Sequence, residues 1–164
     1  RVGDPALDGT DMGPLISKVQ LDRVKSFVPD DAPIMFQGDA PTGKGFWFPP
    51  TILAPVSQND LQYTDEIFGP VAVVVPFDDE ADAIRQANST DYGLAASIFT
   101  KDVGRAIRVS RGVESGVISV NSHSAVRYWT PFGGFKKSGI GRELGPNAIE
   151  HFTEEKNLFI STES

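Results

Sequence analysis

The sequence predicts an α/β fold with a parallel βαβαβ core, and three observations carry that prediction. Val71–Val75 is continuously apolar, which is typical of a strand buried on both faces. Two helical segments, at 78–88 and 102–113, separate this run from apolar runs at 96–99 and 117–120. Each connection is long enough to hold a helix, so we expect parallel strands joined by right-handed crossovers.

The elements before this core carry weaker signals. Apolar residues at helical spacing between Ser17 and Val28 predict a surface helix, and Ile34–Gln37 predicts a short strand. Phe46–Leu53 is aromatic and β-branched, but it contains Pro49 and Pro50. Because proline cannot donate to a strand ladder, we expect an edge strand or an extended crossing segment there.

The core helices carry their own boundary signals. Acidic residues open the helix at 78–88, as the positive end of a helix dipole prefers, and Gly93 ends that unit. Asp102 is placed to cap the second helix. After the core we expect a glycine-rich loop, a helix near Pro146–Thr153 and a last strand at Asn157–Ile160, which pairs elsewhere, including with another chain.

Composition excludes several classes of function. A hydrophobic content of 40% over 164 residues supports a real core, and a net charge of −7 argues against nucleic-acid or anionic-membrane partners. The chain has no cysteine, which removes disulfides, thiolate metal sites and cysteine nucleophiles. It starts at Arg1 with no leader, so we expect an excised or processed piece of a cytoplasmic protein.

Two glycine motifs and two histidines resemble known sites only in part. Gly38–Lys44 fits most of a phosphate-binding loop, but Gly45 replaces the required Ser or Thr and no helix can follow, so we expect an exposed turn. The glycines of 139–145 are spaced one residue too far apart for a dinucleotide loop and indicate a tight turn. His123 and His151 are isolated, so we expect no metal site and no catalytic histidine.

Two blocks are more unusual. In Glu66–Pro70 a carboxylate stands two residues before an aromatic ring; on an extended backbone both would face one side, where they could bind a sugar and a heterocycle. The residues alone favour the plainer alternative, a surface acid beside a core phenylalanine. Pro131–Glu143 is rich in glycine and serine, so its backbone must pass close to a ligand, another backbone segment or a neighbouring subunit.

With these blocks, the sequence resembles the C-terminal third of the NAD(P)-dependent aldehyde dehydrogenases over nearly the whole chain. Several motifs occur in family order and spacing, and together they are specific. They are Gly13–Ile16, Pro49–Leu53, Glu66–Val71, Asn88 with Tyr92–Ala96, Phe99–Asp102, Val120–Asn121, Pro131–Gly134 and Ser138–Glu143.

The resemblance implies roles for particular residues. It assigns Glu66 to the hydroxyls of the nicotinamide ribose and Phe68 to the nicotinamide ring, with Gln20 and Arg23 near the same ribose. The cofactor is then NAD or NADP, without a metal.

The resemblance also implies a substrate passage. It places the loop 122–130, including Val126, at the substrate entrance, and Phe132 in the wall of the aldehyde tunnel. Within that loop Arg127 suits an acidic aldehyde, whereas Tyr128 and Trp129 suit a cation or an apolar chain, and the choice stays open.

The function that the resemblance implies is oxidation of an aldehyde to a carboxylic acid by a full-length enzyme. The family's cysteine nucleophile, its general base and its Rossmann domain lie upstream, so no catalytic residue falls in this chain and we expect it to be inactive alone. Residues 1–153 would be part of the catalytic domain and 154–164 an oligomerisation strand and tail of a homodimer or homotetramer. The alternative is a non-catalytic interaction or oligomerisation module that retains the fold; a related acyl-phosphate reductase is disfavoured by the Glu66–Pro70 motif.

Overall fold

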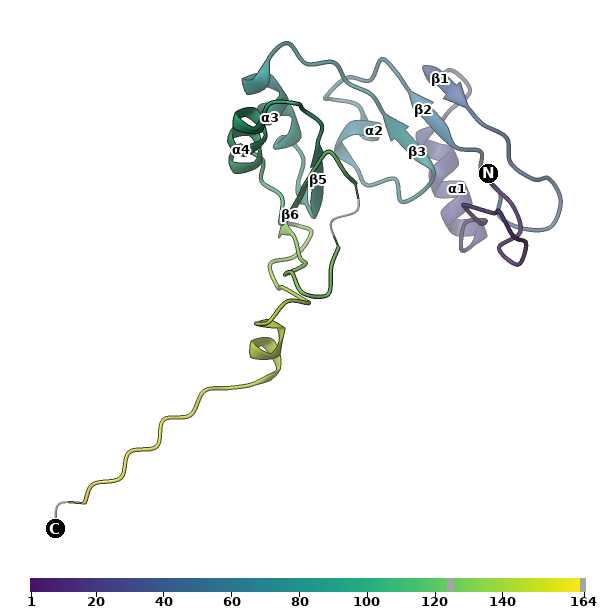
Figure 1. Ribbon diagram of the computed structural model, residues 1–164. Coiled ribbons are helices and arrows are strands. Elements are labelled where there is room, and N and C mark those ends of the chain that lie inside the picture. The colour runs from purple at the N-terminus through teal and green to yellow at the C-terminus, as the bar shows by residue number, and fades with distance from the viewer. Residues whose placement is uncertain (124–125, 163–164) are drawn as a thin grey trace. The chain divides into compact units, whose positions relative to one another are not determined.

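The computed structural model describes residues 1–123 and 126–162. The chain falls into two compact units, Arg1–Asp78 and Asp79–Ser164 (Figure 1). Each unit has its own helices and sheet, and we describe them one after the other. The division that we predict at residues 153 and 154 is a division by role, and it stays a prediction.

The first unit combines a small mixed sheet with a helix. Its elements are α1 (Lys18–Phe27), β1 (Ile34–Gln37), β2 (Thr51–Leu53), α2 (Leu61–Thr64) and β3 (Val71–Val73). The sheet order is β1-β2-β3, with β1 antiparallel and β3 parallel to β2 (Figure 1). The Ser17 hydroxyl caps α1 by accepting a hydrogen bond from the Gln20 amide at 3.1 Å. Both α1 and β1 lie where the sequence predicts a helix and a short strand, so these two predictions are confirmed.

Strand β2 is central in its sheet, so the first of our two alternatives for Phe46–Leu53, an edge strand, was wrong. Leu53 is fully buried and Thr51 is 2% exposed. Pro49 and Pro50 lie just before the first paired residue and therefore occupy no ladder position. The Thr51 amide donates to the Pro70 carbonyl at 2.9 Å, which starts the pairing toward β3.

The core of the first unit joins α1 to the segment before β3. Val24 and Phe27 of α1 pack with Phe48 and Ile67, and all four are buried. Ile67 is the middle residue of the predicted Glu66–Phe68 group, so burial of this one side chain draws the whole group against α1.

The second unit holds two short two-stranded sheets and two helices. Its elements are α3 (Glu80–Ala87), β4 (Tyr92–Gly93), β5 (Ala95–Ile98), α4 (Val103–Gly112), β6 (Val117–Val120), β7 (Phe135–Lys136) and a 3₁₀ helix η1 (Ala148–Phe152). β5 and β6 are parallel and connected through α4 (Figure 1). β4 pairs antiparallel with β7. The carboxylates of Asp79 and Asp102 cap α3 and α4 by accepting a hydrogen bond from a backbone amide of the first turn. The Asp102 cap confirms the prediction.

The predicted three-stranded parallel core does not form as one sheet. β5-α4-β6 is confirmed as a parallel unit, but β3 belongs to the sheet of the first unit, where it pairs with β2. The expected burial of Val71–Val75 on both faces is also wrong. Val71 and Val73 are half-buried, whereas Ala72 and Val74 are exposed, because only one face of β3 is packed within the described residues.

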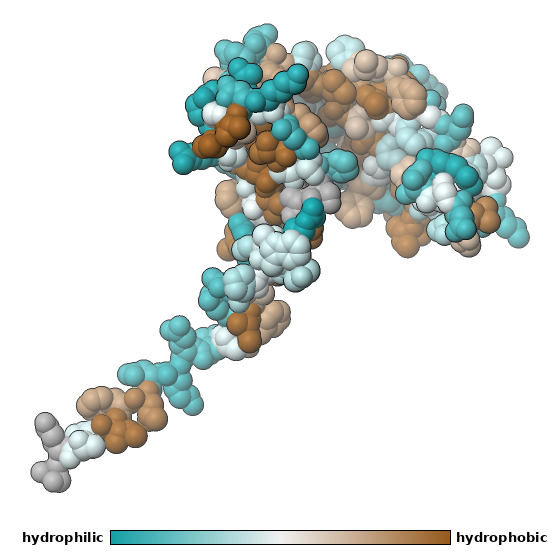
Figure 2. Space-filling model, viewed as in Figure 1, coloured by the Kyte–Doolittle hydropathy of each residue, from teal (hydrophilic) through white to brown (hydrophobic). Residues whose placement is uncertain are grey.

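The C-terminal region differs from its prediction at the expected helix. In place of the expected helix at Pro146–Thr153 there is the short 3₁₀ helix η1, with Ile149 and Phe152 exposed. Asn157–Ile160 has no partner strand among the described residues, and its expected pairing elsewhere, including with another chain, stays a prediction. Figure 2 shows a group of apolar side chains on this segment; Leu158, Phe159 and Ile160 are all more than 70% exposed.

Candidate functional site

The candidate site is the loop Glu66–Pro70 between α2 and β3. Glu66 and Phe68 are exposed, Phe68 by 72%, while Ile67 between them is 8% exposed. The backbone of Phe68 is left-handed, with φ of 58°, so the extended geometry that we expected for this pair is wrong. Such a conformation costs a non-glycine residue roughly 1–3 kcal/mol and persists only where its surroundings hold it.

Helix α1 holds this loop through two side chains. Gln20 Nε2 donates to the carbonyl oxygens of Ile67 at 3.1 Å and Phe68 at 2.8 Å, and Arg23 Nη2 donates to the carbonyl of Glu66 at 2.8 Å. Gln20 and Arg23 are three residues apart and therefore lie on one face of the helix. The structure thus brings together all four residues that we predict to contact the cofactor.

Gly69 allows the loop to lie directly against α1. A Cβ atom at this position would lie 2.5 Å from Cγ2 of Val24 and 3.2 Å from its Cγ1. Val24 is fully buried and cannot move aside. A side chain at Gly69 is therefore excluded by packing, which explains why this loop carries a glycine before its proline.

The second predicted block, Pro131–Glu143, folds back on its own chain. The backbone groups of Phe132 and Glu143 exchange two hydrogen bonds of 2.7 Å. A Cβ on Gly116 would lie 1.9 Å from the Gly133 carbonyl oxygen, and one on Gly133 would lie 2.1 Å from that of Gly141. Of the three explanations that we left open for this block, the structure supports close approach of another backbone segment.

The other glycine motifs form turns, as predicted. Gly139 and Gly145 have φ of 94° and 71°, which other residues rarely adopt. Gly43 and Gly45 also have positive φ in the exposed loop before β2, and no helix follows them. Neither motif forms the start of a helix that could bind a phosphate.

The Lys136 side chain joins the glycine-rich block to the residues at the C-terminal ends of α3 and α4. Its Nζ donates to the carbonyls of Asn88 at 2.8 Å and Thr90 at 3.1 Å and pairs with the Glu114 carboxylate at 2.7 Å. The Asn88 side chain in turn donates to the Gly112 carbonyl and accepts from the Glu114 amide. We did not predict this network, because a lysine in a Lys-Lys pair carries no signal of its partners in sequence.

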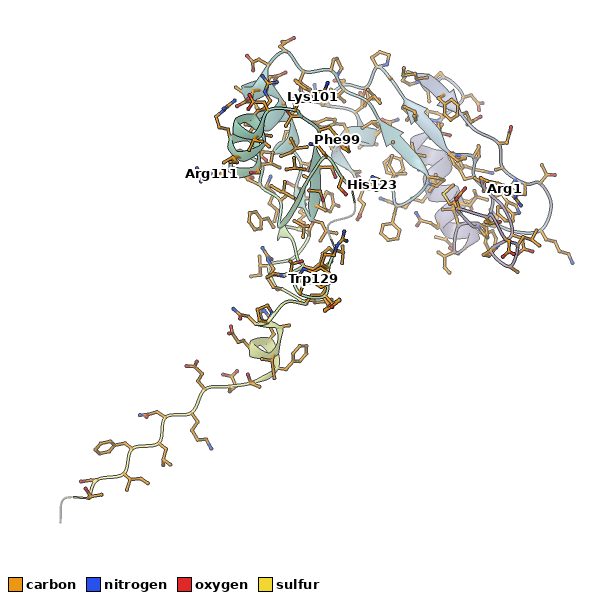
Figure 3. The ribbon with its side chains drawn as sticks, in the orientation of Figure 1. Arg1, Phe99, Lys101, Arg111, His123 and Trp129 are labelled. Atoms are coloured by element: carbon orange, nitrogen blue, oxygen red, sulfur yellow. The ribbon has the colours of Figure 1, made fainter. Side chains whose placement is uncertain are left out.

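The predicted entrance loop follows β6 and Asn121, whose side chain is bonded to the segment after β5. The Asn121 side chain accepts from the Thr100 amide at 2.9 Å and donates to the Thr100 carbonyl at 3.0 Å. These residues border a cavity of about 560 Å³ at the carboxyl ends of β5 and β6, lined also by Phe99, which Figure 3 labels, and Val120. Ser124 and Ala125, within the predicted loop, lie outside the described residues.

Residues 126–130 of the predicted entrance loop are exposed. Val126 is 54% exposed, and the rings of Tyr128 and Trp129, the latter labelled in Figure 3, meet edge to face with centroids 4.5 Å apart. Phe132 is half-buried after this loop. The structure therefore places Val126 and Phe132 in one stretch after β6, with Arg127 donating to the Val126 carbonyl at 2.9 Å.

Ion pairs in the second unit have a structural role. Glu80 on α3 accepts hydrogen bonds from Arg105 and Arg108 on α4 at 2.9–3.1 Å. The bond from Arg108 is the main reason that the pKa of Glu80 lies below its ordinary value, and the same contact raises the pKa of Arg108. The Glu80 carboxylate therefore joins α3 to α4.

The described residues contain no cluster of three His, Cys, Asp or Glu side chains that could hold a metal ion. His123 and His151 are both exposed. Within residues 1–123 and 126–162, no helix is long and apolar enough to cross a membrane. The loop Glu66–Pro70 is the site with the best-defined chemistry, because it presents an exposed carboxylate and an exposed ring on a backbone held by α1.

Comparison with known proteins finds many sequence relatives and many similar solved structures. The model of the Aldehyde dehydrogenase family matches residues 1–158. An aldehyde dehydrogenase of Emericella nidulans is 41% identical over 162 residues, which cover 96% of this chain and 33% of that protein. One from Aspergillus niger is 44% identical over 160 residues, or 95% of this chain and 32% of that protein.

Solved structures agree with these sequence relatives. The NAD⁺ complex of aldehyde dehydrogenase from Bacillus cereus superposes with a TM-score of 0.92 at 35% identity, over 99% of this chain and 34% of that one. The NAD⁺ complex from Mycobacterium tuberculosis gives 0.87 at 41% identity, over 94% and 33%. The chain thus spans about a third of the length of its relatives.

Proposed function

Because this chain belongs to the aldehyde dehydrogenase family, we propose that it supplies part of the cofactor and substrate sites of an enzyme that oxidises an aldehyde to a carboxylic acid with NAD or NADP. The observation that carries the proposal is the loop Glu66–Pro70. It presents an exposed carboxylate and an exposed aromatic ring on either side of a buried isoleucine, on a backbone held by α1.

The two exposed side chains suit a nicotinamide riboside. An ionised Glu66 can only accept hydrogen bonds, and the hydroxyls of a ribose donate them. The Phe68 ring offers a flat apolar face on which a heterocycle can stack. Gln20 and Arg23 belong to the same proposed site, because both already contact the backbone of this loop. When bound, the cofactor accepts a hydride from the substrate.

The proposed substrate passage uses the stretch after β6. Val126 would lie at the entrance and Phe132 in the wall. The edge-to-face pair of Tyr128 and Trp129 would favour an apolar or cationic aldehyde, while Arg127 would favour an acidic one. The exposed apolar segment at Leu158–Ile160 would pair with a second copy of the protein.

The chain alone should not catalyse the reaction. A cysteine thiolate is the nucleophile of the proposed mechanism, and none of the 164 residues is cysteine. We therefore assign no catalytic residue to the chain. Its contribution is to bind and orient cofactor and substrate, which lowers the entropy cost of bringing the reacting atoms together.

A chimera tests this proposal. Residues 1–164 replace the matching third of the Aspergillus niger relative, and aldehyde-dependent NADH formation is measured by absorbance. We expect activity from the chimera, none from the 164-residue chain, and a raised KM for the cofactor with Glu66→Gln. Asp65→Asn is the matched control, since Asp65 is an exposed neighbouring carboxylate. A folded but inactive chimera would favour the non-catalytic module, and equal activity of Glu66→Gln would refute the role of Glu66.

A further inference from the structure

We infer that Lys136 is a positioning residue for the proposed substrate passage. Its ammonium group holds the backbone that carries Phe132 against the ends of α3 and α4, and so sets where the Phe132 ring lies. This inference deepens the proposed function of the stretch after β6 and rests on it. It goes beyond a contribution of Lys136 to stability, because it concerns which aldehydes the passage accepts.

The Lys136 ammonium group is fully occupied by the protein. A lysine side chain has three N–H donors and no acceptor. The three partners here are the Asn88 carbonyl at 2.8 Å, the Thr90 carbonyl at 3.1 Å and the Glu114 carboxylate at 2.7 Å. The side chain is also 25% exposed, so most of it is covered. Lys136 therefore acts on the surrounding backbone and not on a bound aldehyde.

The partners of Lys136 are themselves held in place. Asn88 Nδ2 donates to the Gly112 carbonyl at 2.7 Å, and Asn88 Oδ1 accepts from the Glu114 amide at 2.8 Å. Asn88 directly follows α3, and Gly112 is the last residue of α4. One amide side chain thus joins the C-terminal ends of both helices, and Lys136 binds to that junction.

The backbone before Lys136 lies against the same junction. Lys136 has φ of 54°, which a residue other than glycine rarely adopts, and it lies in β7, which pairs with β4. A Cβ on Gly116 would lie 1.9 Å from the Gly133 carbonyl oxygen. The Gly133 backbone therefore lies directly on Gly116, two residues after Glu114. The stretch 133–136 is held at both of its ends.

Phe132 directly precedes this stretch. Its backbone exchanges two hydrogen bonds of 2.7 Å with Glu143, and the residue is half-buried. Close-packed surroundings transmit a shift of the backbone to the side chains that it carries. Release of the Lys136 ammonium group would therefore displace the Phe132 ring, and a displacement of about 1 Å at a binding site can cost on the order of a hundredfold in rate.

The test uses the chimera with the Aspergillus niger relative and measures its selectivity between two aldehydes. The readout is the ratio of kcat/KM for hexanal to that for propanal. Phe132→Ala should change this ratio about tenfold, the order of magnitude that a small difference in apolar contact contributes. Lys136→Met should change it in the same direction and leave the KM for NAD unaltered. A purely structural loss would lower kcat for both aldehydes equally and keep the ratio.

A double variant shows whether Lys136 acts through the ring. In Phe132→Ala the ring is already absent, so adding Lys136→Met should not change the ratio further, whereas additive changes would overturn the inference. Lys136→Arg restores donors to the two carbonyls and to Glu114, and should recover part of the ratio. Lys137→Met is the matched control, because Lys137 pairs with Asp91 where both side chains are exposed, and should keep the ratio.

Two further measurements cover variants that fold poorly. Glu114→Gln keeps the shape of the carboxylate partner without its charge, and should move the ratio in the same direction as Lys136→Met. Backbone ¹⁵N relaxation of residues 132–135 in the 164-residue chain requires no activity, and should show faster motion in Lys136→Met and not in Lys137→Met. Thermal unfolding confirms that each variant is folded at the assay temperature.

The outcomes separate this inference from the proposed function. If Phe132→Ala changes the ratio and the folded Lys136→Met does not, the inference is wrong and the proposed passage stands. If Phe132→Ala leaves the ratio unchanged, the proposed role of Phe132 fails, and the inference fails with it. If the chimera is inactive, the proposed function fails, and the relaxation data alone decide whether Lys136 orders the backbone of Phe132.

Discussion

Substitution of Gly69 by alanine should destabilise the first unit, because it forces a methyl group into the contact between the loop and α1. The new Cβ would lie 2.5 Å from Cγ2 and 3.2 Å from Cγ1 of Val24, well inside normal contact distance. Val24 is fully buried, so neither group can rotate into solvent. Overpacking of this kind lowers the free energy of unfolding by about 1–3 kcal/mol.

A second substitution shows whether this contact is the cause. Val24→Ala alone removes two buried methyl groups and should cost about 2 kcal/mol. In the double variant the methyl group added at position 69 enters the space that the valine side chain vacates. The loss should therefore be smaller than the sum of the two single losses, by about 1–3 kcal/mol, because the residues are in direct contact.

Urea unfolding followed by tryptophan fluorescence gives these values. In a Trp129→Phe background the signal comes from Trp47 and reports the first unit alone. Gly38→Ala is the matched control, because the nearest atom to its Cβ would be at an ordinary 3.6 Å, and its effect should stay within about 0.5 kcal/mol. Additive losses, or a neutral Gly69→Ala, would refute the packing argument.

Three further predictions concern the second unit. Lys136→Met leaves two carbonyls without their donor, so the unfolding free energy should fall by about 1–3 kcal/mol when it is measured by Trp129 fluorescence in a Trp47→Phe background; no change would contradict the network. The hydrogen bond from the Arg105 amide lowers the pKa of the Asp102 carboxyl below its ordinary value of 3.8. The ionised carboxylate therefore stabilises the fold above pH 3.8, and this stabilisation is lost as the pH falls through the pKa of the folded state. Asp102→Asn should make the unfolding free energy depend less on pH in this acid range. Light scattering should show a multimer that Phe159→Asp reduces to a monomer, and a monomeric unsubstituted chain would oppose that prediction.

Local signals predicted α1, α3 and α4 and the Asp102 cap of α4, whereas the Ser17 cap of α1 was not predicted. Asp102 and Ser17 precede amphipathic stretches, and each cap depends only on residues three positions away. The parallel unit β5-α4-β6 follows equally from neighbouring segments, because a helical crossover forces parallel strands.

Pairing between distant segments was harder to predict. Val71–Val75 reads as a strand buried on both faces, yet β3 is packed on one face only, and its partner is β2, where Thr51 lies opposite Val71. The prolines before Thr51 indicated an edge strand although they end where the ladder begins. Periodicity records which residues are apolar, and the partner strand is chosen by tertiary packing.

The candidate site shows the same division. The carboxylate, the ring and the Gly-Pro turn of Glu66–Pro70 could be found in the sequence, and the family resemblance added Gln20 and Arg23. Their hydrogen bonds to three consecutive carbonyls could not be found, since the partners lie more than 40 residues apart in the chain. The left-handed Phe68 was missed because a bulky residue rarely adopts that conformation.

The central claim is that Glu66–Phe68 faces the nicotinamide riboside. The measurement that tests it most directly is the set of intermolecular nuclear Overhauser effects between the chain and bound nicotinamide riboside. We predict contacts between the nicotinamide ring protons and the Phe68 ring, which disappear in Phe68→Ala. Contacts confined to other aromatic residues, such as Tyr128 and Trp129, would contradict the claim.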